Sequence, residues 1–153
     1  MRRHIWKVLA GLVGVFVLAQ LVPYRVDNPK ARDEPKWDSP ATRALAKRAC
    51  YDCHSNETHV LAFEQVAPLS WWITNHVKEG RSAVNFSTWH TKAGEHAGEP
   101  GESVSEGGMP PSYYHWFGLH SGSKLTAAEV KALLAGLQKT VAADPPKGGG
   151  GGG

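Results

Sequence analysis

The two cysteines of the chain lie three positions apart in the segment Cys50-Tyr51-Asp52-Cys53-His54. Thiols at this spacing can reach both vinyl groups on one edge of a haem, while the next histidine reaches the iron from the same turn. The pattern is typical of covalent haem attachment. It therefore predicts one haem c, bound through thioethers from Cys50 and Cys53. His54 is the predicted proximal iron ligand, with Nε2 on iron and Nδ1 donating to a backbone carbonyl.

A cysteine pair at this spacing has alternative roles: a local disulfide, a redox-active dithiol, or half of a zinc site that also uses His54 and His59. A thioredoxin-like dithiol follows a strand in a βαβ pattern, and this sequence has no such pattern. A structural zinc ion usually takes two ligand pairs from separate segments. Haem attachment is therefore the preferred interpretation.

The sixth position on the iron has several candidates, because seven other histidines and one internal methionine are present. Met109 is preferred because it lies in Gly107-Gly108-Met109-Pro110-Pro111, where glycines permit close approach and prolines stiffen the segment. His76 is the alternative distal ligand, since it lies on an aromatic face of a predicted helix. The remaining alternatives are an open five-coordinate iron, His115 and His120.

Aromatic side chains are the expected walls of a haem pocket, because they combine large apolar area with N–H or O–H groups for the propionates. The candidates in this sequence are Trp72, Tyr113 and Tyr114, together with Trp71 and Trp116. Arg81 either pairs with a propionate through its guanidinium or is an ordinary solvated arginine after a helix end.

Helix signals surround the cysteine motif, whereas no strand pattern stands out. Ser39 can cap a helix over 40–50 that runs into the motif. Apolar residues at helical spacing predict a second helix over 68–80, which a glycine stops. A third helix over 127–141 opens with a Thr-Ala-Ala-Glu capping box. The predicted fold class is all-α, a small c-type cytochrome-like helical domain around one covalent haem.

An apolar run over 8–22 follows three basic residues, and its flanks extend it to about the 20 residues that a membrane span needs. The basic residues favour keeping this end in the cytoplasm. We therefore expect a single-pass transmembrane helix within 5–24, anchored in a bacterial inner membrane with the haem domain in the periplasm. The alternative is a cleaved signal peptide with an apolar core over 8–18 and cleavage after Ala19.

The chain beyond this segment divides by composition. Residues 25–38 mix charges with prolines and are expected to be a tether, so that 1–24 is the anchor or signal peptide. Residues 39–144 are the predicted haem-binding domain, and 145–153 a flexible Pro/Gly tail. Residues 94–108 contain five glycines and four glutamates, which predicts a mobile acidic loop without a part in the chemistry.

The charge balance excludes one class of partner. Three of the 17 basic residues precede the apolar run, so residues 23–153 carry 14 basic and 14 acidic side chains. Nucleic-acid binding needs a clustered basic excess and is therefore excluded. No catalytic constellation stands out, so a tethered electron carrier with an unidentified redox partner is preferred over an enzyme. The alternatives are a five-coordinate haem enzyme or sensor for peroxide or a diatomic gas, and an accessory protein that haem stabilises.

Three segments resemble the bacterial haem-binding domain family, small membrane-anchored monohaem proteins with one CxxCH. They are WDSPATRALAKRACYDCHSNET at 37–58, APLSWWITNHVKEGRSAVNFSTW at 67–89 and GGMPPSYYHWFGLHSGSKLTAAEVKALLAGL at 107–137. The resemblance implies a covalent haem on Cys50 and Cys53 with His54 as axial ligand, in an exported helical domain. It implies haem binding without a particular reaction. The sequence departs from the family at 59–65, without the usual Trp, Pro and Tyr run, and at 93–106, which is Gly-rich where a helix is usual.

Overall fold

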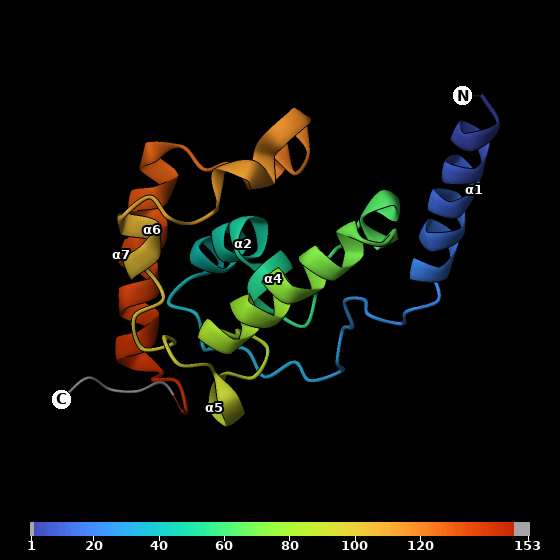
Figure 1. The fold of residues 1–153 in the computed structure, drawn as a ribbon. Coiled ribbons are helices and arrows are strands. Elements are labelled where there is room, and N and C mark those ends of the chain that lie inside the picture. Colours follow the sequence, from blue (N-terminus) through green and yellow to red (C-terminus); the bar gives the residue numbers. More distant parts are fainter. Residues whose placement is uncertain (1, 149–153) are drawn as a thin grey trace.

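The computed structural model describes residues 2–148, which form helices joined by turns and extended segments (Figure 1). The α-helices are α1 (Arg2–Ala19), α2 (Pro40–Ala49), α3 (Tyr51–His54), α4 (Leu69–Ala83), α5 (Trp89–Lys92), α6 (Glu102–Ser105) and α7 (Ala127–Ala143). Short 3-10 helices are η1 (Ala62–Gln65), η2 (Ser112–Gly118) and η3 (Ser121–Ser123). Residues 2–148 contain no strand, only an isolated bridge between Asp33 and Thr88. The all-α part of the predicted fold class is confirmed. Most of the predicted Pro/Gly tail lies outside the described residues.

The predicted transmembrane helix is wrong. Helix α1 has 18 residues and ends at Ala19, whereas we expected a span within 5–24. Three basic residues interrupt its first turns, so its continuous apolar part is 8–19. At 1.5 Å per residue this part is roughly 18 Å long, against a bilayer core of about 30 Å. Among residues 2–148, no helix is both long enough and apolar enough to cross a membrane.

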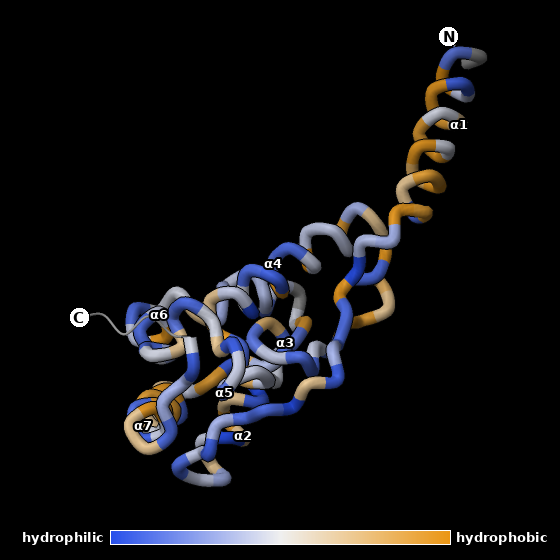
Figure 2. The backbone as a smooth tube through the Cα atoms, turned by 90° about the horizontal axis from the view of Figure 1, so that it is seen from below, coloured by the Kyte–Doolittle hydropathy of each residue, from blue (hydrophilic) through white to orange (hydrophobic). Residues whose placement is uncertain are grey.

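Gln20 explains why α1 stops where it does. Its side-chain amide donates to the carbonyls of Phe16 at 3.0 Å and Ala67 at 3.1 Å, and its Oε1 accepts from the Ala67 N–H at 2.9 Å. These bonds turn the chain away from the helix axis toward the segment before α4. Figure 2 shows α1 projecting from the rest of the molecule.

The hydrophobic core lies between α2, α3, α7 and the segment that follows α4. Phe86 stacks on Tyr51 and on Trp89, each at 5.8 Å between ring centroids. Helix α7 contributes Leu133 and Leu137 to this core. The packing of α7 on α2 requires Gly136, because a Cβ there would overlap the Thr42 side chain.

Two of the predicted helix starts are confirmed in detail. The Ser39 hydroxyl accepts from the Thr42 N–H at 3.2 Å, with Pro40 in the first turn. Thr126 and Glu129 form the predicted capping box at the start of α7. Such caps depend on a few consecutive residues, which is why the sequence alone predicts them.

His90 joins two segments that lie far apart in the sequence. Its Nδ1 is 2.6 Å from Asp33 Oδ1, and its Nε2 is 2.9 Å from Asp144 Oδ2. A carboxylate can only accept, so both ring nitrogens donate and the ring is cationic. The hydrogen bond to Asp33, followed by that to Asp144, raises the pKa of His90. The bond from His90 lowers the pKa of Asp33, while the bond from the Lys36 N–H is the main cause that lowers the pKa of Asp144.

We expect His90→Gln to destabilise the protein in a limited pH window. The raised pKa of His90 stabilises the folded state. This stabilisation is fully present below the ordinary pKa of 6.5 and is lost as the pH rises through the pKa of the folded state. The lowered pKa values of Asp33 and Asp144 give stability that is present above 3.8 and is lost in stronger acid. The cost should therefore be largest between these limits, about 1 kcal/mol after allowance for solvent screening.

Urea unfolding of His90→Gln and wild type at about pH 5.5 and about pH 9 measures this difference. The matched control is His59→Gln, because the His59 side chain is exposed. An equal cost of His90→Gln at both pH values would show that the ring stabilises the fold only by packing.

Candidate haem site

The cysteine motif folds into one helical turn, α3, directly after α2. The N–H groups of Cys53 and His54 both donate to the Cys50 carbonyl, at 3.2 and 2.9 Å. This turn brings both sulfurs and the imidazole to the wall of one pocket. Burial raises the pKa of Cys50 to about 12, and burial followed by the charge of Asp52 raises that of Cys53 to about 11. A redox-active dithiol needs a lowered pKa, so these values argue against that alternative.

The His54 ring is held in one orientation by the chain that follows α4. Its Nδ1 lies 3.1 Å from the Val84 carbonyl, and its own carbonyl accepts from the Phe86 N–H at 2.9 Å. Because a carbonyl can only accept, Nδ1 carries the proton and Nε2 keeps a free lone pair. Burial lowers the pKa of His54, which favours the neutral ring. This is the form in which histidine binds a metal.

Met109 lines the same pocket as His54. The N–H groups of Gly108 and Met109 both donate to the Ser103 carbonyl, at 2.8 and 3.1 Å. Gly107 has a φ of 76°, in the left-handed region that favours glycine. The structure thus brings the predicted proximal and distal ligands to one pocket, across 55 positions of sequence.

Tyr114 ties the methionine-bearing segment to the haem-attachment turn. Its hydroxyl donates to Asp52 Oδ2 at 2.5 Å, and its ring stacks on His120 with centroids 4.2 Å apart. His120 Nε2 in turn lies 3.0 Å from Glu64 Oε1. Tyr114 also lines the pocket, where a haem wall was predicted.

The other predicted site residues lie elsewhere. His76 has its Nδ1 3.1 Å from the Trp72 carbonyl and packs against the rings of Trp72 and Tyr113. Trp72 and Tyr113 contact each other at 5.2 Å between centroids. None of these three residues is among the described residues that line the pocket. The alternative distal ligand His76 therefore lies outside the pocket that His54 and Met109 line, and its role stays a prediction.

The acidic loop forms part of the pocket wall, while its lack of a part in the chemistry stays a prediction. Loop residues on the wall include His96, Glu99 and Val104. His96 is held by a bond from its N–H to the Ala83 carbonyl at 2.8 Å. The sequence signal that was missed is Val104, an apolar residue between glutamates. It lies in the short helix α6.

The residues that line the pocket suit a haem. The space free of protein atoms is about 1120 Å³ and includes open solvent. Cys50, Cys53, His54 and Met109 line it, and Val84, Phe86 and Leu133 supply apolar surface. Among the residues that the structure describes, no three or more His, Cys, Asp or Glu side chains are grouped to hold a bare metal ion. Haem iron needs only one or two protein ligands, because the porphyrin supplies the others.

Residues 14–139 match the family model of the haem-binding domain. The match covers most of the chain, so the protein belongs to the haem-binding domain family, as the resemblance of its three segments implied. Haem is therefore supported as its ligand. No curated protein and no solved structure matches the chain.

Proposed function

We propose that the protein is a monohaem c-type electron carrier. Cys50 and Cys53 bind the haem through thioethers, and His54 and Met109 are its axial ligands. The observation that carries this proposal is the single pocket lined by all four side chains, in which the Val84 carbonyl leaves His54 Nε2 free. When bound, the haem supplies an iron that takes up and releases one electron.

The remaining pocket residues favour reversible electron transfer. Val84, Phe86 and Leu133 line the pocket with apolar side chains, and a low dielectric favours the oxidation state of lower net charge. A histidine and a methionine together raise the reduction potential. Met109 is 40% exposed, so a partner protein can approach that edge of the pocket closely.

We also propose that residues 39–144 work as the haem domain in the periplasm. Support comes from the motif, because free cysteines tend to oxidise outside the cytoplasm and covalent haem attachment uses them there. The basic residues followed by the apolar run over 8–18 have the composition of an export signal.

The test is a redox titration of protein produced in cells that attach haem to exported chains. We expect one reversible one-electron transition, low-spin spectra in both states, and no binding of carbon monoxide by the reduced form. A high-spin spectrum with ready binding of carbon monoxide or cyanide would contradict the carrier and favour a five-coordinate enzyme or sensor.

A further inference from the structure

Arg81 is a partly buried cation beside the haem-attachment turn. Its Nε donates to the Ser55 carbonyl at 2.7 Å, and its Nη2 donates to the Asp27 carbonyl at 2.9 Å and to Thr58 Oγ1 at 3.0 Å. The Arg81 side chain is 12% exposed, whereas the Asp27 side chain, whose carboxylate lies 3.4 Å away, is 76% exposed. This charge is therefore solvated mainly by neutral oxygens of the protein.

The last turn of α4 and the residues after it hold the turn that carries His54. Gly80 lies so close that a Cβ there would be 2.6 Å from the Cys53 carbonyl oxygen. The Val84 carbonyl holds the His54 ring at 3.1 Å. Arg81 adds the contact to Ser55, one residue after His54. Among these contacts the one from Arg81 is made by a side chain, so a substitution can remove it selectively.

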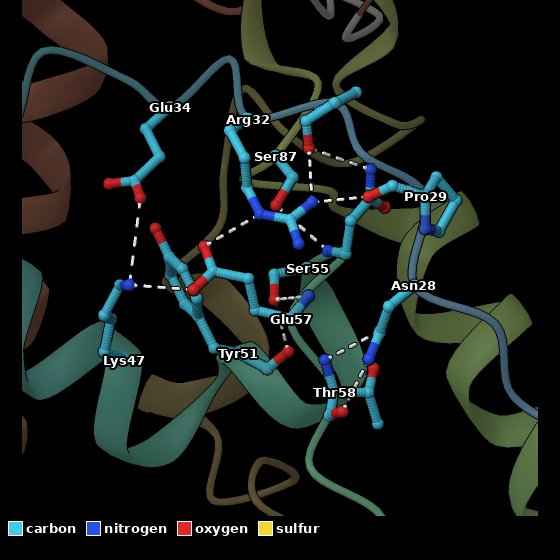
Figure 3. Close-up of polar contacts among 12 residues, drawn as sticks. Asn28, Pro29, Arg32, Glu34, Lys47, Tyr51, Ser55, Glu57, Thr58 and Ser87 are labelled. Carbon is cyan, nitrogen blue, oxygen red and sulfur yellow. Dashed lines mark hydrogen bonds and ion pairs between the residues drawn. The ribbon is translucent and has the colours of Figure 1, made fainter.

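Residues 28–32 also hold the segment after His54 (Figure 3). The Thr58 N–H donates to Asn28 Oδ1 at 3.0 Å, and Arg32 Nε lies 3.6 Å from Glu57 Oε1. Arg81 Nη2 also donates to Asn28 Oδ1, at 3.1 Å. Its guanidinium thus joins α4, the segment after His54 and the N-terminal segment.

We propose that Arg81 is the positioning residue of the iron ligand His54 and that its partly buried charge favours the reduced haem. This inference rests on the proposed function. A fixed Ser55 carbonyl sets the direction in which the preceding residue presents its ring, and contacts behind a ligand tune its metal. A nearby positive charge in a low dielectric stabilises the state of iron with the lower charge.

The first test compares reduction potentials of haem-loaded Arg81→Gln and Arg43→Gln. Arg43 is the matched control, because it pairs with Glu34 at 2.6 Å with its side chain 43% exposed. We expect Arg81→Gln to lower the equilibrium constant for reduction about tenfold, equivalent to about 59 mV for one electron. Arg81→Lys should recover most of this loss, because it keeps the charge. Equal potentials in Arg81→Gln and Arg43→Gln would overturn the electrostatic role.

The second test uses the haem-free chain and the ¹⁵N chemical shifts of the His54 ring. Wild type should show the tautomer with a proton on Nδ1, as the Val84 contact requires. Arg81→Lys keeps the charge but loses the planar guanidinium group, so it should show mixed tautomers. An unchanged tautomer in Arg81→Lys would overturn the positioning role, even if Arg81→Gln does not fold. A wild-type chain without covalent haem would defeat the proposed function and leave this measurement valid.

Discussion

Met109→Ala is expected to leave the haem attached while it lowers the reduction potential and opens the sixth position on the iron. The thioether lies in a loop held at the Ser103 carbonyl, and alanine cannot reach the metal. Loss of a methionine ligand removes the bond that favours reduced iron. The expected fall is on the order of 100 mV, within the range of about 0.8 V that axial ligands span. A methionine–iron bond gives ferric haem a weak absorption band at long wavelength. This band should vanish in Met109→Ala, and the reduced iron should bind carbon monoxide.

Two histidine variants are matched controls for Met109→Ala. His76→Ala should keep the wild-type spectrum, because that ring packs on Trp72 and Tyr113 outside the pocket. His96→Ala should also keep it, although His96 lines the pocket. If His96→Ala opens the iron and Met109→Ala does not, the distal ligand is His96 and the assignment of Met109 is wrong.

Features set by a few neighbouring residues were predictable from the sequence. The caps at Ser39 and Thr126 are examples, since each bond spans three positions. The chemistry of the cysteine motif is equally local. The end of α4 was not predictable in this way: the helix continues to Ala83 because Gly80 serves as the contact with Cys53 rather than as a stop.

The surroundings of the site depend on contacts that sequence periodicity does not contain. The aromatic face of α4 was found correctly, but the chain places Tyr113 against Trp72 and His76 there. The acidic loop also lines the pocket, and its apolar residue Val104 was a weak signal. The membrane prediction failed because α1 ends at Ala19 and carries three basic residues in its first turns, so its apolar part is too short to span a bilayer.

Covalent attachment is the second large effect that we expect, and it depends on Cys50 and Cys53 together. Both sulfurs line the pocket beside His54, and neither forms a disulfide. The double variant Cys50→Ser, Cys53→Ser should therefore lose its haem completely on denaturation. Its hydroxyls have nearly the shape of the thiols but form no thioethers, and His54 alone cannot hold a haem in an unfolded chain.

The mass of the denatured, intact chain tests this central claim most directly. Wild type and the double variant are both produced in cells that export the chain and attach haem, and both are treated in the same way. We predict that denatured wild type keeps the mass of one haem and that the double variant has the mass of the bare chain. A wild-type chain that loses all its haem on denaturation would contradict the account.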